Sequence, residues 1–464
     1  MIDQSTICAI ATSPGMGAIA TIRLSGDKAI VIADAVFQSP KSGKTLAGQK
    51  PNTLHFGSIY DQVELIDEVV VAIFHAPHSF TGEEVVEITC HGSVYIQQRI
   101  LQLLILKGAR MARPGEFTQR AFLNGKMDLS QAEAVADLIA STNRAAQKVA
   151  INQMRGGFST ELSKLRSELL HFIAMIELEL DFSEEDVEFA DREQLKKLVS
   201  KIEAILRKLK DSFQLGNVIK NGIPVAIVGD TNVGKSTLLN ALLNEEKAIV
   251  SPIHGTTRDV IEDVVNIHGT AFRFFDTAGI RETTDEIETI GIERSYHKLD
   301  QATVVILVVD TQNDFGVISE RINKIRQRIN SQSLIIAANK MDQGLAETIA
   351  CLKELPLSVN EKLVFIAARQ KLNLEELINE MQKAVSLDSL SEDAVIVTNV
   401  RHFEALAHAH ESIERVNVGL DNRITGDFLA QDIRQCLYYL GEITGAISND
   451  EILGHIFKNF CIGK

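Results

Sequence analysis

A glycine-rich loop in the middle of the chain carries residues suited to hold a chain of phosphates. Residues 229–236 fit the pattern GxxxxGK[ST], follow a predicted strand over 224–228 and precede a predicted helix over 236–243. The backbone N–H groups of such a loop approach phosphates closely, its lysine supplies charge to the β- and γ-phosphates, and its hydroxyl binds Mg²⁺. We therefore predict nucleotide and Mg²⁺ binding here by Asn232, Val233, Gly234, Lys235, Ser236 and Thr237.

Three further motifs select the base and surround the γ-phosphate. Residues 339–342 (NKMD) end a predicted strand, and the Asp342 carboxylate can accept hydrogen bonds from two guanine donors that adenine lacks. Residues 255–259 (GTTRD) resemble a first switch, in which Thr257 would reach Mg²⁺, and residues 276–279 (DTAG) resemble the second. At the last element GTPases usually have a serine where this chain has Ala367. The predicted ligand is GTP, bound also by Gly255, Thr256, Asp276, Thr277, Ala278, Gly279, Asn339, Lys340, Ala367, Ala368 and Arg369.

The hydrolytic residues differ from those of Ras-like GTPases, which place a glutamine directly after the DxxG motif to orient the attacking water. Here that residue is Ile280, which cannot do so. Either the chain is a switch that barely hydrolyses GTP, or Asp285, Glu286 or Glu288 takes this role, and spacing alone does not choose among them. Asn232 favours a K⁺ ion beside the phosphates, where an arginine finger would otherwise place its charge.

The elements that must position these motifs alternate between strand and helix from about 216 to 385. Strands are predicted over 224–228, 272–275, 304–309, 334–338 and 363–366, which indicates a mostly parallel sheet with helices on both faces. Prolines are absent between Pro114 and Pro224 and after Pro356, so long helices can form there. Leu162, Leu165, Leu169, Phe172 and Ile176 recur at helical spacing, as do Leu195, Leu198, Ile202, Ile205 and Leu209.

The predicted fold class is multidomain, α/β plus all-α. An N-terminal α/β domain over 1–120 shows short β-branched runs at 19–22 and 69–73. A helical domain is split in sequence into 121–215 and 386–464, and a Ras-like P-loop GTPase domain over 216–385 is inserted into it. The acidic run at 181–186 is interpreted as a solvated connection.

Composition argues against several protein classes. The 464 residues carry a formal net charge of −15, a poor match for a protein that coats nucleic acid. The five cysteines form no CxxC pair, which favours a reducing, cytoplasmic setting over a disulfide framework or zinc site. The start lacks the cationic head of a signal peptide, and the apolar runs are too short to span a bilayer. We expect a cytosolic protein with no membrane anchor.

Together with these motifs, three further segments make the chain similar to the MnmE (TrmE) family of tRNA-modification GTPases. They are residues 77–83 (PHSFTGE), residues 112–124 (ARPGEFTQRAFLN) and residues 461–464 (CIGK). The resemblance runs from end to end. It implies a homodimer whose N-terminal domain binds 5-formyltetrahydrofolate or methylene-tetrahydrofolate. It also implies action with the flavoprotein MnmG to install an aminomethyl or carboxymethylaminomethyl group at the 5-position of the wobble uridine in certain tRNAs.

The resemblance also implies roles for particular residues. Folate contacts fall on Arg23, Glu87, Lys126 and Lys464, as cations for the glutamate tail and a carboxylate for the pterin donors. The hydrolytic water falls to Glu288, and Cys461 falls on a cysteine that the family needs for tRNA modification. Mg²⁺ falls on Ser236 and Thr257. The K⁺ ligands fall on the Asn232 side chain and on carbonyls around Ser251, Ile253 and Thr256, in a cation loop that also contains Pro252, His254 and Gly255.

Two alternatives compete with this interpretation. A ribosome-assembly GTPase would share the asparagine of the phosphate loop and the apolar residue after DxxG, but it would usually carry a basic RNA-binding module, which this sequence lacks. Cys461 stands fourth from the end, as in a lipidation box, yet Gly463 is not aliphatic and Lys464 is a poor final residue.

Overall fold

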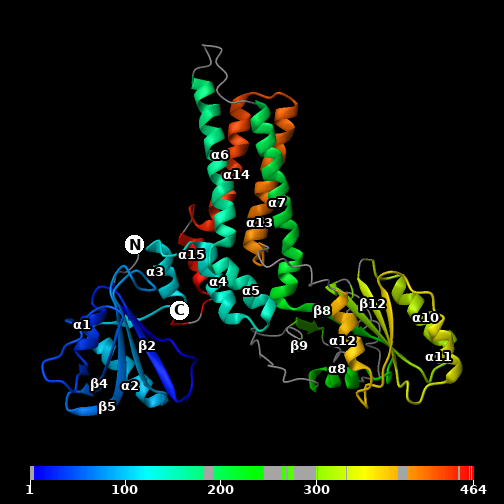
Figure 1. The fold of residues 1–464 in the computed structure, drawn as a ribbon, viewed down its shortest axis with the longest axis horizontal. Helices are drawn as coiled ribbons and strands as arrows, with labels where there is room; N and C mark the ends of the chain where they lie inside the picture. Colours follow the sequence, from blue (N-terminus) through cyan, green and yellow to red (C-terminus); the bar gives the residue numbers. More distant parts are fainter. Residues whose placement is uncertain are drawn as a thin grey trace, which may run out of the picture. The chain divides into compact units, whose positions relative to one another are not determined.

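The computed structural model describes residues 5–181, 192–244, 263–267, 270–275, 299, 301–330, 332–384, 395–447, 450–458, 460 and 462–463. These residues form two compact units. The first unit comprises residues 1–139, 153–203 and 408–464, and the second comprises residues 140–152 and 204–407. Figure 1 shows the helices and strands of both units, coloured along the sequence.

The first unit begins with a seven-stranded sheet in the order β3-β4-β5-β6-β2-β1-β7. Burial alternates along its longest strand, β5, so that Val69, Val71 and Ile73 face the core while Glu68 and Val70 face outward. The core lies between this face and helices α1 and α2. The elements are β1 (Ile7–Ile10), β2 (Ile19–Ser25), α1 (Ala29–Asp34), β3 (Phe37–Gln38), β4 (Thr53–Asp61), β5 (Glu64–Phe74), β6 (Val85–His91), α2 (Val94–Leu106), β7 (Arg110–Met111) and α3 (Glu116–Leu123).

Long helices make up the rest of this unit. Helix α6 packs along α14, and the apolar residues that recur along α6, among them Leu162, Leu165 and Leu169, are buried. The end of the chain returns to the N-terminal domain, because α15 contacts α3 and a Cβ on Gly463 would lie 2.3 Å from the Ile10 carbonyl oxygen. The helices are α4 (Leu129–Ala140), α5 (Arg144–Met154), α6 (Gly157–Asp181), α7 (Arg192–Asn221), α13 (Val400–Asp421), α14 (Gly426–Thr444) and α15 (Asp450–Lys458), of which α4, α5, α7 and α13 lie partly in the second unit.

The second unit contains a six-stranded sheet in the order β13-β12-β11-β8-β10-β9. All neighbouring strands are parallel except β9 and β10. The central strand β11 is buried at every residue, as expected for a strand covered on both faces. The elements are β8 (Ile223–Val228), α8 (Lys235–Asn244), β9 (Asp263–Ile267), β10 (Thr270–Phe274), β11 (Val304–Asp310), α10 (Phe315–Arg326), β12 (Ser333–Asn339), α11 (Ala346–Lys353), β13 (Glu361–Phe365) and α12 (Leu374–Lys383).

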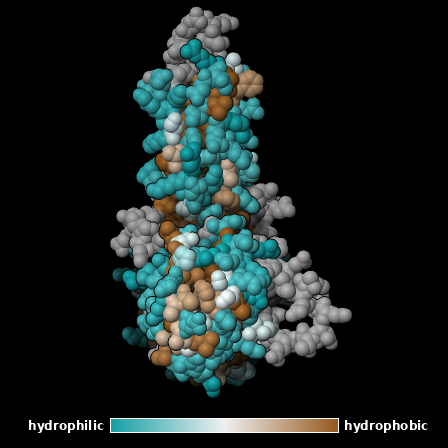
Figure 2. All heavy atoms as spheres, turned by 90° about the vertical axis from the view of Figure 1, so that its right-hand side faces the viewer, coloured by the Kyte–Doolittle hydropathy of each residue, from teal (hydrophilic) through white to brown (hydrophobic). Residues whose placement is uncertain are grey.

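The predicted fold class is confirmed: an α/β N-terminal domain, long helices from two separate stretches of the chain, and an α/β domain between them. The visible face of the long helices is mostly hydrophilic with scattered apolar residues (Figure 2). None of the helices in the described part of the chain has the length and hydropathy needed to cross a membrane. The predicted domain boundaries themselves stay predictions.

Candidate functional site

The glycine-rich loop runs from the end of β8 into α8 and turns through an unusual backbone. Gly229, Asn232 and Gly234 all have positive φ, at 148°, 62° and 102°. A Cβ on Gly229 would lie 2.3 Å from the Val308 carbonyl oxygen, and one on Gly234 would lie 2.3 Å from Nδ2 of Asn339. Glycine is therefore required at both positions for the loop to pass this close to β11 and β12. Ser236 and Thr237 follow it, exposed at the start of α8.

Lys235 curls back under this loop. Its Nζ donates hydrogen bonds to the carbonyl oxygens of Gly229 and Asp230, at 2.9 and 2.5 Å, and the residue is only 7% exposed. Burial lowers the pKa of Lys235, an effect that the charge of Asp230 partly opposes. A buried ammonium that donates to carbonyl oxygens stabilises an anion placed at the mouth of the loop, because the anion compensates for the water that the lysine has lost.

Asn339 joins the three parts of the predicted guanine site. Its Nδ2 donates to the Val233 carbonyl at 2.8 Å, and its Oδ1 accepts from the Ala368 N–H at 3.0 Å. The residue is 3% exposed. In this structure the Asn339 amide thus ties the phosphate loop to the element at 367–369, where Ala367 and Ala368 are buried and Arg369 is exposed.

The remaining residues of the NKMD motif are held at the end of β12. Lys340 has a positive φ of 60°, and its Nζ pairs with Asp310 Oδ2 at 2.6 Å. Asp342 is exposed and accepts one hydrogen bond, 2.8 Å long, from Gln370 Nε2. Sequence reasoning missed Asp310, although its position directly after the buried run of β11 is a usable signal, because the carboxyl ends of parallel strands meet at one edge of the sheet.

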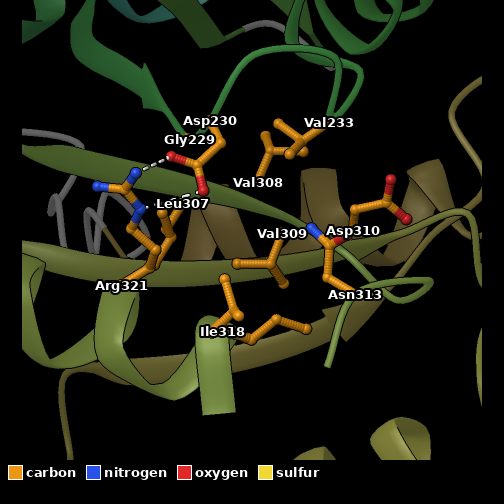
Figure 3. A pocket seen from close by; sticks show the side chains of 11 residues that line it. Gly229, Asp230, Val233, Leu307, Val308, Val309, Asp310, Asn313, Ile318 and Arg321 are labelled. Atoms are coloured by element: carbon orange, nitrogen blue, oxygen red, sulfur yellow. Dashed lines mark hydrogen bonds and ion pairs between the residues drawn. The ribbon is translucent and has the colours of Figure 1, made fainter. Parts of the chain in front are cut away.

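A second contact of the loop was also missed by sequence reasoning. Arg321 of α10 forms a two-pronged ion pair with Asp230, with Nε–Oδ2 and NH2–Oδ1 distances of 3.0 and 2.5 Å (Figure 3). The pocket beside this pair is lined by Val308, Ile318 and other apolar residues and has a volume of about 10 Å³, near the size of one water molecule. This pocket is too small for a nucleotide and lies between β11 and α10.

Many of the predicted site residues lie outside the described residues, so the structure gives them no place. Among them are the hydrolytic candidate Glu288 and the cysteine Cys461. The others are Ser251, Pro252, Ile253, His254, Gly255, Thr256, Thr257, Asp276, Thr277, Ala278, Gly279 and Lys464.

The predicted folate contacts that are described gather around the loop at residues 77–83. Arg23 and Glu87 face each other across β2 and β6 and form an ion pair of 2.7 Å. The Arg23 guanidinium also lies over the rings of Phe80 and Phe117, at 5.6 and 5.8 Å. Lys126 donates from Nζ to the Pro77 carbonyl at 2.9 Å. A ligand of this pair would therefore have to share or replace partners that Arg23 and Glu87 already have.

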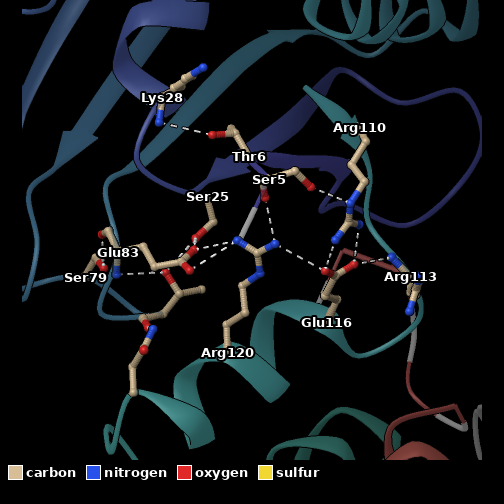
Figure 4. A network of polar contacts seen from close by, with 12 residues as sticks. Ser5, Thr6, Ser25, Lys28, Ser79, Glu83, Arg110, Arg113, Glu116 and Arg120 are labelled. Atoms are coloured by element: carbon tan, nitrogen blue, oxygen red, sulfur yellow. Dashed lines mark hydrogen bonds and ion pairs between the residues drawn. The ribbon is translucent and has the colours of Figure 1, made fainter. Parts of the chain in front are cut away.

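A buried charge network fixes the other side of the same loop (Figure 4). Arg120, 3% exposed, donates to both carboxylate oxygens of Glu83, at 3.2 and 3.0 Å, and to Glu116 at 3.3 Å. Glu116 also accepts two hydrogen bonds from Arg110, at 2.8 and 2.6 Å. Burial alone would raise the pKa of Glu116, but the hydrogen bonds from Arg110 and the Arg113 N–H hold the pKa below its ordinary value.

Comparison with known proteins covers the whole chain. The family model of the GTP-binding protein TrmE N-terminus matches residues 6–126, and that of the MnmE helical domain matches residues 129–461. The tRNA modification GTPase MnmE of Bacteroides thetaiotaomicron is 57% identical over 100% of both chains, and that of Flavobacterium johnsoniae is 55% identical over the same share. This chain belongs to the MnmE family. The resemblance seen in the sequence is thereby confirmed.

Membership of the MnmE family, together with the phosphate loop, makes the chain a GTP hydrolase that acts in tRNA modification. It also decides against the ribosome-assembly alternative, because the match extends through the N-terminal and helical domains. A crystal structure of Aquifex aeolicus Era bound to GDP and AlF4⁻ is 30% identical and covers 41% of this chain and 66% of its own, with a TM-score of 0.28. At that score the likeness adds nothing to what the full-length MnmE relatives show.

Proposed function

We propose that the chain is a K⁺-stimulated GTPase that works with a flavoprotein of the MnmG kind on the wobble uridine of certain tRNAs. The reaction would add an aminomethyl or carboxymethylaminomethyl group at the 5-position of that base, and GTP hydrolysis would drive conformational change in the complex. The observation that carries the GTPase part is the buried ammonium of Lys235, which contacts a loop with positive φ at Gly229, Asn232 and Gly234. The tRNA part rests on the full-length MnmE relatives.

The loop suits the two cations that this proposal needs. The Ser236 hydroxyl is exposed at the first turn of α8, where it can bind Mg²⁺ together with Thr257. Asn232 is exposed at the turn itself, where its side-chain oxygen can bind K⁺ with carbonyls of residues 251–256. When bound, the two cations supply positive charge that stabilises the charge developing on the phosphates. Glu288 would position the attacking water, since Ile280 cannot.

The guanine site follows from the same geometry. Asp342 follows the end of β12, is exposed and accepts a hydrogen bond from Gln370, so its carboxylate can turn to the two donors of the base. Asn339 would not contact the base itself. It would position the phosphate loop and the Ala368 N–H relative to each other through its two hydrogen bonds. The missing serine hydroxyl at Ala367 leaves backbone N–H groups to contact the base.

The N-terminal domain would bind the tetrahydrofolate that supplies the one-carbon unit. Arg23, Glu87, Phe80 and Lys126 surround the loop at 77–83 with the cations, carboxylate and ring that a pterin with a glutamate tail would contact. The tail of the chain approaches the same domain at Gly463, which supports a role there for Lys464 and Cys461.

We also propose a cytoplasmic homodimer that contacts MnmG and tRNA. The outer face of the N-terminal sheet supports dimerisation, because Leu54 and Phe56 are 72% and 56% exposed and Phe56 lies opposite exposed Val70. The net charge of −15 suggests that contacts to tRNA are shared with the partner.

The potassium proposal has a direct test. Hydrolysis should be much faster in KCl than in NaCl of equal ionic strength, because an arginine finger is worth about 10³–10⁵ in rate and K⁺ would replace it. Asn232→Ala should remove the difference between the salts while Glu288→Ala should abolish turnover in both. Equal rates of the wild-type protein in KCl and NaCl would rule the idea out.

The modification proposal is tested separately from hydrolysis. Cys461→Ser should leave phosphate release by the purified protein near normal, because Cys461 belongs to the helical domain in sequence and not to the GTPase domain. The same variant should fail to restore the modified wobble uridine in cells that depend on it, as measured by nucleoside analysis of their tRNA. Complete modification by the variant would show that the thiol is dispensable.

A further inference from the structure

Three side chains capable of binding a metal converge between α7 and α13, far in sequence from every motif considered above. Glu203 comes from α7, and His410 and Glu414 come from α13, all within the first unit. One ligand atom from each side chain lies within 4.8 Å of the other two. The two helices are in direct contact at this level, because Asn417 Nδ2 donates to Glu203 Oε2 at 2.9 Å.

The buried histidine His410 distinguishes this group from a cluster of surface carboxylates. Its side chain is 5% exposed, its Nδ1 faces Glu414 Oε1 at 3.5 Å, and its Nε2 is buried without a hydrogen-bond partner among the described residues. A buried imidazole normally satisfies its ring nitrogens. Among the described residues Nε2 has no partner, and Nδ1 faces the Glu414 carboxylate beyond good hydrogen-bond distance, so the ring retains capacity for a ligand.

The spacing along α13 supports a common site. His410, Glu414 and Asn417 are separated by four and three residues, so they lie on one face of the helix. Asn417 holds the Glu203 carboxylate from the side. Partners of this outer kind orient metal-binding carboxylates and are typical of built metal sites.

We propose that Glu203, His410 and Glu414 bind one Zn²⁺ ion that links α7 to α13. An imidazole with two carboxylates is a set of ligands that Zn²⁺ accepts, at about 2.0–2.2 Å, and water completes its tetrahedron. In a tetrahedron with bonds of this length the bound atoms lie about 3.3–3.6 Å apart, so a separation near the 4.8 Å limit must shorten by about 1.2–1.5 Å. The exposed side chain of Glu414 can supply that movement by rotating.

This site would act on the two helices that lead into and out of the GTPase domain in sequence. Helix α7 ends at Asn221, directly before β8 and the phosphate loop, and α13 is the next helix after α12 in the described part of the chain. A metal bridge would stabilise the folded helical pair by mass action, because the ion binds the folded form and not the separated helices. Metal binding and nucleotide binding are separate properties in this proposal, since none of the three ligands belongs to the nucleotide site.

The test compares two histidine–glutamate pairs on the same helix. The full-length protein is stripped with a chelator, dialysed against Zn²⁺ in the presence of Mg²⁺, and analysed for zinc per chain by atomic emission. Wild-type protein should hold one zinc more per chain than Glu414→Gln or Glu203→Gln, and Zn²⁺ should raise its melting temperature but not theirs. The control variant removes the exposed pair His408 and Glu411, whose atoms lie 3.6 Å apart, and should behave like wild type.

A graded variant sharpens the result. Asn417→Ala should keep the site but weaken Zn²⁺ binding by about 10–100-fold, as loss of an orienting partner does. Glu414 is exposed, so Glu414→Gln should remain folded, and circular dichroism checks this. Equal zinc content and equal melting shifts in wild type, Glu203→Gln and Glu414→Gln would overturn the proposal, as would loss of the zinc in the His408 and Glu411 control.

Discussion

The nucleotide loop and the N-terminal charge network use buried cations in opposite ways. Lys235 is 7% exposed and Arg120 is 3% exposed, so both cations are largely removed from solvent. Lys235 donates hydrogen bonds to uncharged carbonyls of its own loop, whereas Arg120 donates to the carboxylates of Glu83 and Glu116. The charge of Lys235 remains available to a ligand, while that of Arg120 is neutralised within the domain.

This difference separates a binding site from a structural support. A buried cation without a carboxylate partner indicates a site where anionic ligands bind and leave, and its loss should affect activity more than folding. A cation enclosed by carboxylates holds a fold together, and its loss leaves those carboxylates buried without a partner. The loop at 77–83 depends on such a support, since Glu83 belongs to the loop and is bound from below by Arg120.

The largest expected effect is a change of nucleotide preference when the guanine-binding residue Asp342 is replaced. Asp342→Asn should shift preference from GTP to xanthosine triphosphate by a factor on the order of 10⁴, because polar groups that a bound base covers reject a base that leaves them unpaired. Competition binding of the two nucleotides measures this. Gln370→Ala, which removes only the neighbour of Asp342, serves as the control, and unchanged GTP affinity in Asp342→Asn would contradict the assignment.

The second prediction concerns the charge network. Arg120→Met should lower the local free energy of unfolding of the N-terminal domain by about 3–5 kcal/mol, because the half-buried Glu83 loses its guanidinium partner and the buried Glu116 keeps only Arg110. Hydrogen exchange of the β2 and β6 amides reports this domain alone. Arg99→Met breaks a more exposed pair with Asp61 and should cost about 1 kcal/mol or less. Similar losses in the two variants would show that the network is not a structural support.

The third prediction concerns Lys235, the buried cation of the nucleotide loop. Lys235→Ala should reduce GTP hydrolysis by about 10²–10³-fold, the usual effect of removing one charge-stabilising donor. Its melting temperature should change little, since only hydrogen bonds to two carbonyls are lost. Lys324→Ala removes an exposed lysine from α10 and should hydrolyse GTP normally. A large loss of stability in Lys235→Ala would place this lysine with the structural cations.

The smallest expected effect is the response of the network to acid. The pKa of Glu116 is lower in the folded protein than its ordinary value of 4.5, so the stability it contributes is present above that value and is lost as the pH falls through the lowered pKa. The difference in N-terminal stability between wild type and Glu116→Gln should therefore shrink below about pH 5. Thermal unfolding at several pH values checks this, and a difference that grows in acid has the wrong sign for this mechanism.

The sequence predicted much of the GTPase domain but little of the network. The phosphate loop is a local pattern between a strand and a helix, and its five predicted strands appear within a few residues of their expected bounds. Strand β9 was not predicted. Contacts such as Arg120 with Glu83 and Arg321 with Asp230 join residues 37 and 91 positions apart, so only the folded chain brings them together.

The predicted folate contacts in the N-terminal domain were predicted from the sequence better than the charge network but less well than the GTPase domain. Arg23 and Glu87 were named only through the resemblance, since each alone reads as an ordinary charge on a strand. Their pairing across β2 and β6 depends on strand register, which a single sequence does not specify. His410 shows the same limit, because nothing in its own helix reveals that Glu203 of α7 lies beside it.

The central claim is that GTP hydrolysis at the phosphate loop serves modification of the wobble uridine in tRNA. The most direct measurement is nucleoside analysis of tRNA from cells that lack this protein and receive either the wild-type chain or Lys235→Ala. We predict that the wild-type chain restores the modified uridine and that the variant, present at equal amount, does not. Full modification with Lys235→Ala, or unchanged wobble uridines in the cells that lack the protein, would contradict the claim.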